Sequence, residues 1–287
     1  MPVGAGMTRR HLLHSGALAL AGCATSPTPA GAPVPVKAGP FTVDVPAAWA
    51  KTAVVRKVPL KPLYTEAEWQ AQLKDKSLVL KPSYENRPQH WAVRLPAAVP
   101  KGVDHDPKGG GGSEAPEILI HKAAEWAVAF SDGLHAEHPG AAERRRIRKD
   151  METSGRSPAY FDASLDCQCL KKRLNFAGGR GVRFVCQWGI EPDLIRKGRL
   201  HYQFVGLSDD DTCQIIATFP LDLPGLPDRD TRTHLGRNVD PYGDFSKGVE
   251  AYYEDAEKWL AQHAAKIAPS LPTLDAMISS LVARTWA

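Results

Sequence analysis

The chain has 287 residues, 43% of them hydrophobic and 24% charged, which is the composition of an ordinary globular protein. This length suits one large domain or two small ones. The formal net charge is +4, and it falls to +2 without Arg9 and Arg10, which lie in a segment that we expect to be removed. A surplus this small argues against a nucleic-acid-binding protein.

The N-terminus has the pattern of a bacterial export signal. From Met7, a positively charged start is followed by a short apolar run and small residues as far as Gly22. The run is too short for a stable membrane span and is typical of a secretory signal peptide. Residues 8–13 also resemble a twin-arginine export motif, with an ordinary charged start as the alternative. We expect residues 1–22 to be the signal.

The four residues 20–23, Leu-Ala-Gly-Cys, resemble a bacterial lipobox. The resemblance implies that Cys23 is acylated, for example with palmitate, and becomes the first residue of the mature chain. A plain signal peptide with a chance cysteine is the alternative. Ala24, rather than Asp, follows the cysteine, and in lipoproteins of diderm bacteria this implies sorting to the periplasmic face of the outer membrane. More than one acyl chain would be needed for stable anchoring.

After Cys23 the sequence up to residue 40 contains five prolines. We expect residues 23–40 to be the lipidated cysteine followed by a semi-extended tether that builds no core. The body then follows as a single domain over 41–287.

The first half of the body predicts strands with one short helix. Phe41–Pro46 alternates apolar and polar residues, as a half-buried strand does, and with the following Ala-Ala-Trp it resembles the opening of PsbP-like domains. Thr65 and Glu68 form a capping box that predicts a helix start. Further strands are expected at Thr52–Pro59, His90–Leu95 and Glu117–His121, and a further helix at Ala123–Phe130.

Two polar stretches interrupt this half. Residues 101–117 are glycine-rich, including Gly109–Ser113, and predict a mobile connection that is either a surface loop or a lid. Residues 144–149 are almost all basic. They are either a solvated helix face or a surface that meets anionic head groups or an acidic partner.

The chain is organised around three sequential strands between Gly178 and Pro224. Strands are predicted at 182–188, 201–207 and 212–219, and a polar turn, Ser-Asp-Asp-Asp at 208–211, joins the last two. With that turn, Phe204 should face Ile215. A calcium loop is the alternative interpretation of the aspartates, but their spacing does not fit an EF-hand.

Two amphipathic helices are predicted at the C-terminus. Apolar residues step by three and four between Asp244 and Ile267, and again from Leu274 to Leu281. These helices should cover one face of the sheet. The predicted fold class is therefore α+β, an antiparallel sheet with C-terminal helices packed on one face, following a disordered signal and the proline-rich tether.

The second half of the body also carries a resemblance. Secreted bacterial lipoproteins of unassigned function resemble the chain over roughly its last 110 residues, in the segments 181–184, 202–211, 219–221 and 269–281. This resemblance implies an exported body and supplies no catalytic residues.

The body contains four cysteines, Cys167, Cys169, Cys186 and Cys213. In an oxidising compartment four cysteines allow two disulfides with three connectivities. Cys167 and Cys169 are two apart in an expected strand and lie at or beyond the limit for pairing directly. We expect each of them to pair with Cys186 or Cys213. The alternative is buried free thiols that pack as small hydrophobic groups.

Candidate catalytic and metal-binding chemistry is sparse. His135 and His138 are three apart, with His90 and His121 elsewhere, but no third ligand stands at a known metal spacing. No HExxH, Gly-x-Ser-x-Gly, P-loop or dinucleotide fingerprint is present. We therefore expect no catalytic residues, no metal and no cofactor.

These features lead to a functional hypothesis. We expect a lipid-anchored envelope protein that is held at the membrane, binds a protein partner, and is not an enzyme. One version is an immunity or inhibitor lipoprotein acting against a toxin in the periplasm; another is an accessory to envelope assembly or secretion. The alternatives are a periplasmic hydrolase-type enzyme using histidines and carboxylates, and a small-ligand carrier.

Overall fold

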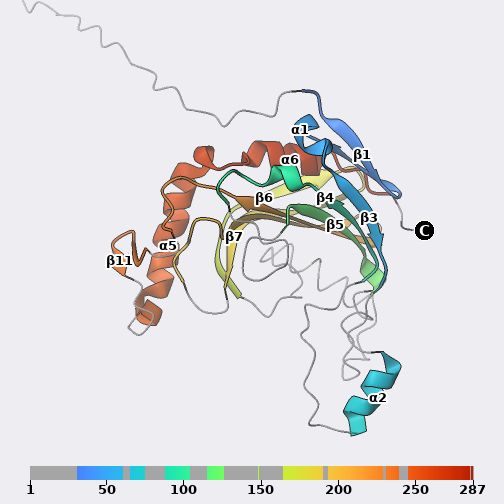
Figure 1. Cartoon of the computed structure of the whole chain (residues 1–287), viewed down its shortest axis with the longest axis horizontal. Helices are drawn as coiled ribbons and strands as arrows, with labels where there is room; N and C mark the ends of the chain where they lie inside the picture. The colour runs from blue at the N-terminus through green and yellow to red at the C-terminus, as the bar shows by residue number, and fades with distance from the viewer. Residues whose placement is uncertain are drawn as a thin grey trace, which may run out of the picture.

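The structure is a computed structural model that describes most of the chain beyond residue 30 (Figure 1). The described residues are 31–60, 65–74, 88–103, 115–125, 148, 164–189, 193–228, 231–238, 245–284 and 286. Among them, seven strands form one antiparallel sheet with the order β3-β4-β5-β9-β8-β7-β6. Its strands are β3 (Val54–Val58), β4 (His90–Arg94), β5 (Glu117–Lys122), β6 (Ser164–Phe176), β7 (Gly179–Gly189), β8 (Leu200–Ser208) and β9 (Cys213–Leu221).

The remaining elements are helices and two small hairpins. The hairpins pair β1 (Val34–Ala38) with β2 (Phe41–Val45), and β10 (Thr233–His234) with β11 (Arg237–Asn238). The α-helices are α1 (Ala47–Ala50), α2 (Glu66–Lys74), α5 (Phe245–His263) and α6 (Leu271–Ser279). Short 3₁₀ turns are η2 (Pro96–Ala98), η3 (Ala123–Glu125) and η4 (Ala264–Lys266). No helix among these is long and apolar enough to cross a membrane.

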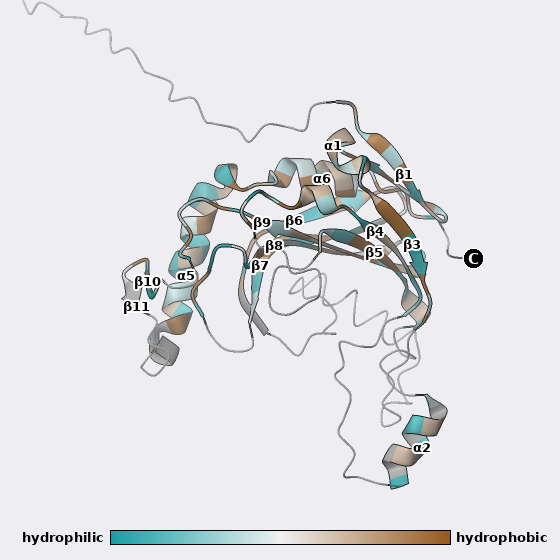
Figure 2. Cartoon of the chain, in the orientation of Figure 1, coloured by the Kyte–Doolittle hydropathy of each residue, from teal (hydrophilic) through white to brown (hydrophobic). Residues whose placement is uncertain are grey.

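The α+β fold predicted from the sequence is confirmed. Helices α5 and α6 both pack against β6, and their inward side chains join the larger of two hydrophobic clusters. These inward residues are Tyr252, Ala256, Leu260, Leu271, Leu274, Met277 and Ile278, and Leu281, just after α6, joins the same cluster. Hydrophilic and hydrophobic residues alternate along α5 (Figure 2), as expected for a helix with one buried face. The smaller cluster, on the opposite face of the sheet, contains Phe184, Cys186, Val205, Leu207 and Ile216.

Most of the strand and helix predictions in the first half of the body are also confirmed. The capping box is formed, because Glu68 accepts a hydrogen bond from the Thr65 amide at 2.8 Å and the Thr65 hydroxyl accepts from the Glu68 amide at 3.3 Å. The helix expected at Ala123–Phe130 is a 3₁₀ turn over its first three residues, and its remainder lies outside the described residues.

The tether prediction is wrong for residues 34–38. These form β1, which pairs along its whole length with β2, and Ala38 is buried. Proline content misled the prediction, because a proline such as Pro35 removes a backbone donor but is tolerated in an edge strand. Residues 31–33 are described and belong to no helix or strand, residues 39–40 are the turn between β1 and β2, and residues 23–30 lie outside the described part of the chain.

The β8–β9 hairpin is two residues out of the expected register. Phe204 pairs with Ala217 rather than with Ile215. A shift of two leaves every side chain on its predicted face, whereas a shift of one would have exchanged the faces. The predicted division into a helix-facing side and an opposite side therefore still holds.

The cause of this shift lies in the turn. Ser208 remains in β8, so the connection is Asp209–Thr212. The Asp210 carboxylate accepts hydrogen bonds from the Ser208 hydroxyl at 2.7 Å and from the Thr212 amide at 3.1 Å. Asp211 adopts a positive φ of 57°, which aspartate tolerates better than most residues. The carboxylate at the centre of the turn is thus engaged in local hydrogen bonds, in keeping with a turn rather than with a calcium loop.

Candidate interaction site

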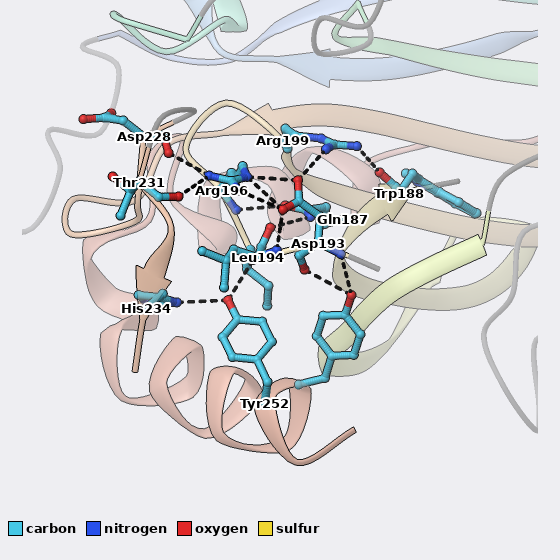
Figure 3. Close-up of polar contacts among 12 residues, drawn as sticks. Gln187, Trp188, Asp193, Leu194, Arg196, Arg199, Asp228, Thr231, His234 and Tyr252 are labelled. Atoms are coloured by element: carbon cyan, nitrogen blue, oxygen red, sulfur yellow. Dashed lines mark hydrogen bonds and ion pairs between the residues drawn. The ribbon is translucent and has the colours of Figure 1, made fainter. Parts of the chain in front are cut away.

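Residues 193–199, which we call the locked loop, lie between β7 and β8 and rest against α5 (Figure 3). Two neighbouring tyrosines of α5 hold its backbone. The Tyr252 hydroxyl accepts a hydrogen bond from the Ile195 amide at 2.8 Å. The Tyr253 hydroxyl accepts from the Asp193 amide at 3.2 Å and donates to the Asp193 carbonyl at 3.1 Å. The helix therefore fixes the start of the loop.

An acid flanked by two arginines fixes the side chains of the locked loop. Arg196 donates from Nε to both carboxylate oxygens of Asp193, at 3.0 and 2.9 Å, and Arg199 donates to one of them at 3.2 Å. Burial alone would raise the pKa of Asp193, but the hydrogen bonds and charge of Arg196, with the charge of Arg199, lower it below its ordinary value. The carboxylate stays ionised at neutral pH and binds both cations.

Contacts with two other segments complete the arrangement (Figure 3). Gln187 of β7 is fully buried, donates to the Leu194 carbonyl at 2.9 Å and accepts from the Arg196 amide at 2.9 Å. Arg196 also donates from Nη1 to the carbonyls of Asp228 and Thr231, at 2.8 and 2.9 Å. The locked loop is therefore joined to the sheet, to α5 and to the segment that precedes α5.

A tyrosine–histidine pair borders this network. Tyr252 and His234 of β10 are joined by a 3.0 Å contact between the hydroxyl and Nδ1. Burial lowers the pKa of His234 and raises that of Tyr252, so both groups are neutral near pH 7. The hydroxyl also accepts from the Ile195 amide, and the imidazole tautomer sets which of the two groups donates in the contact with His234. The pair therefore acts as a fixed hydrogen bond that holds β10 against α5.

The outer surface of the locked loop carries positive charge. Lys197 and Arg232 are exposed, and 40% of the Arg199 side chain is accessible. Asp228 is an exposed acid beside them among the described residues. The site thus presents cations from a backbone that is held in place on three sides, an arrangement suited to binding a surface of opposite charge.

All four body cysteines are buried, and none of them is joined in a disulfide. The disulfides expected from the sequence are not formed in the structure, and the sheet gives the reason. Cys167, Cys169 and Cys213 face the helix side, whereas Cys186 faces the other side. Cys213 on β9 is three strand spacings from β6, which is about 14 Å. No pair of these residues on different strands meets the distance and direction that a disulfide needs.

Burial also makes the thiols of Cys167, Cys169 and Cys213 unreactive. It is the main reason why the pKa of Cys169 is raised to about 12, and it raises the pKa of Cys167 and Cys213 as well. The lipidation candidate, Cys23, lies outside the described residues.

The structure brings two of the four candidate histidines together. His90 and His121 are directly paired across β4 and β5, with ring centroids 4.8 Å apart, and both are buried on the sheet face away from the helices. Gln214 of β9 continues the same row. His135 and His138 lie outside the described residues, and within the described part of the chain no three His, Cys, Asp or Glu side chains form a metal-binding group.

One residue of the basic stretch 144–149 can be placed. Arg148 forms an ion pair with Asp211 of the β8–β9 turn. Its neighbours in that stretch lie outside the described residues.

Sequence reasoning missed the locked loop. Asp193 and Arg196 are spaced three apart in a charged connection, which could have indicated a local ion pair. The contacts that make the loop rigid join residues about sixty positions apart, and no local pattern shows them.

No protein-family model matches the chain, and comparison with curated proteins and with solved structures found no match either.

Proposed function

We propose that this chain is a lipid-anchored protein of the bacterial cell envelope that binds a protein partner and does not act as an enzyme. The lipobox at residues 20–23 supports the anchor. One observation carries the binding role: the locked loop presents Lys197 and Arg199 from a backbone already fixed by α5 and β7. The partner surface that fits it is acidic.

Rigidity is what makes this loop a better candidate than the other described connections. A flexible loop loses conformational entropy on binding, at about 0.5–1.5 kcal/mol for each immobilised side chain. In the locked loop much of that cost is met on folding, because Asp193 and Gln187 already hold Arg196 in place. Loops held on a rigid scaffold are the usual carriers of binding function.

Two kinds of partner fit a tethered envelope protein of this type. In the first, the partner is a toxic enzyme that arrives in the periplasm, and the chain is its immunity or inhibitor lipoprotein. In the second, it is a component of envelope assembly or secretion. A gene for a secreted toxin next to the gene for this chain supports the first.

A pull-down from membranes with the lipidated protein tests the proposal. A saturable partner should be captured, and the double variant Lys197→Glu, Arg232→Glu should reduce capture at least about tenfold, because like charges then face each other. Lys171→Glu with Lys266→Glu changes the charge equally at exposed positions elsewhere and should leave capture unchanged. If no partner is bound saturably, or if the two double variants capture the partner equally well, the proposal fails.

A second candidate function uses the other face of the sheet. That face is not filled with apolar side chains alone, because His90, His121, His201 and Gln214 are buried on it. A small-ligand carrier or a hydrolase would use such a row. In that case His121→Phe would abolish ligand binding or activity and leave capture of the protein partner intact.

A further inference from the structure

Positive charge is concentrated at the N-terminal end of the mature chain. Residues 23–60 have a net charge of +3, whereas residues 61–287 have a net charge of −1. The four cations of the first segment are all exposed, as is its one acid, Asp44. These cations are Lys37, Lys51, Arg56 and Lys57.

These cations lie along one edge of the molecule. β3 is an outer strand of the seven-stranded sheet, and it carries Arg56 and Lys57 on opposite faces. β1 lies against β3 and carries Lys37, and α1, which ends just before Lys51, packs against β1. The tight approach of Gly39 to Trp91, the residue opposite Lys57, brings the β1–β2 turn close to that lysine.

Two of the exposed apolar side chains lie at the same edge. Among the described residues, the large hydrophobic side chains that are exposed are Val34 at 42%, Val54 at 50% and Val282 at 37%. Val34 belongs to β1 and Val54 to β3, whereas Val282 is bridged both to Thr42 of β2 and to Ala177, which follows β6. Both β1 and β3 change from hydrophobic to hydrophilic along their length (Figure 2). Cations mixed with exposed apolar groups are the composition of a surface that rests on lipid head groups.

We propose that this edge, formed by Lys37, Lys51, Arg56, Lys57, Val34 and Val54 and called the basic edge here, docks on an anionic lipid surface. Its orientation toward the membrane rests on the proposed acylation of Cys23. Ten residues lie between Cys23 and Val34, so the start of β1 stays within about 40 Å of the acylated residue. A lipid anchor and a basic surface together give the two signals that stable attachment requires.

This docking would also orient the proposed partner site. The basic edge is at the β3 side of the sheet, whereas α5 packs on β6 at the opposite side (Figure 1). The locked loop, which rests on α5, would then point away from the membrane.

Vesicle co-sedimentation of the full chain carrying Cys23→Ser tests the basic edge without the lipid. The protein should bind phosphatidylcholine vesicles that contain about one-quarter phosphatidylglycerol more tightly than phosphatidylcholine alone, and added salt should weaken this binding. The triple variant Lys37→Gln, Arg56→Gln, Lys57→Gln should reduce partitioning about 100-fold, because each cation near an anionic surface contributes about fivefold.

The matched control is Lys171→Gln, Arg173→Gln, Lys266→Gln, which removes the same charge at exposed positions away from the basic edge and should bind as the parent does. Circular dichroism and the urea midpoint show whether both triple variants are folded. Equal binding by the edge variant and the parent, or equal loss in both triple variants, overturns the proposal.

Mass spectrometry of the chain with its natural Cys23, purified from membranes, separates the proposed lipid anchor from the proposed docking of the basic edge. It shows whether the chain carries the mass of acyl groups. If acyl mass is absent while edge-dependent vesicle binding persists, the anchor fails and the edge stands. If acyl mass is present without edge dependence, the edge alone fails.

Discussion

Asp275 of α6 is a buried carboxylate that joins the helix to the sheet. Arg183 of β7 donates to both of its oxygens at 3.0 Å, Lys172 donates at 2.9 Å, and the Tyr202 hydroxyl donates at 3.2 Å. Asp275 and Arg183 are 6% and 7% exposed, so neither charge is well solvated. Burial would raise the pKa of Asp275, but the hydrogen bonds and charges of Arg183 and Lys172 lower it below the ordinary value.

Removing the Asp275 carboxylate should therefore strongly destabilise the folded state. Asp275→Asn leaves the buried Arg183 without its counter-charge and should reduce the free energy of unfolding by about 3–5 kcal/mol. Urea denaturation at neutral pH measures this. Asp255→Asn, which breaks the exposed pair with Lys258 at 3.2 Å, is the control and should cost less than about 1 kcal/mol. Similar losses in the two variants would show that the Asp275 pair is not a buried charge pair.

Burial of His201 predicts how stability falls in acid. Its pKa is lowered to about 4, mainly by burial, against about 6.5 in the unfolded chain. Below pH 6.5 the unfolded state therefore binds a proton that the folded state does not. The free energy of unfolding should fall between pH 6.5 and 4 by up to about 3 kcal/mol from this group. Asp275 affects stability in a lower pH range than His201 does. Its stabilising contribution is present above about pH 3.9 and is lost as the pH falls through the lowered pKa of the folded state.

Urea midpoints at several pH values between 7 and 4 test this. In His201→Leu the urea midpoint should fall less steeply across that range, since the variant has no imidazole to protonate at this position. Gln203→Leu is the control: it replaces another buried polar side chain of β8 that carries no titrating group, and it should keep the parent's pH dependence. A parent-like slope in His201→Leu would contradict the assignment.

At the scale of elements, the locked loop depends on one acid. Asp193→Asn removes the shared partner of Arg196 and Arg199, and the carboxylate is partly accessible, so a loss of about 1–2 kcal/mol is expected. The locked loop should open locally, without unfolding of the sheet. Hydrogen exchange at the amides of Ile195 and Arg196 should become at least about tenfold faster, which corresponds to that free energy.

Asp228→Asn is the matched control for this prediction. Arg196 binds the backbone carbonyl of Asp228, and this change leaves the carbonyl in place. Exchange at Ile195 and Arg196 should therefore stay as in the parent. Unchanged exchange in Asp193→Asn would mean that the tyrosines of α5 hold the loop without help from the acid.

The main strands and helices could be predicted from the sequence. Local periodicity placed β7, β8, β9, α5 and α6, because each buries one regular face. It misplaced the β8–β9 register by two, because the choice depends on which side chains cap the turn. The candidate site could not be predicted from the sequence, since Tyr252 contacts Ile195 only in the folded structure.

For the whole molecule, the free thiols are the main departure from expectation. Spacing predicts that cysteines can meet, but it does not show which face of a sheet each one takes. Cys186 lies opposite Gln168, between the positions of Cys167 and Cys169, yet it projects to the other side. The folded body is therefore a reduced core, and burial keeps the thiols of Cys167, Cys169 and Cys213 protonated.

A reduced core has a consequence for folding in an oxidising compartment. The unfolded chain exposes all four body thiols, and a disulfide between different strands would conflict with the native sheet. Refolding from urea with glutathione disulfide should therefore recover several-fold less native protein than refolding with reductant, as measured by circular dichroism. Replacing the four body cysteines with alanine should remove the difference, and equal recovery of the parent under both conditions would contradict the prediction. For the proposed exported protein, folding before export would avoid this hazard, and the twin-arginine route that Arg9 and Arg10 resemble would allow it.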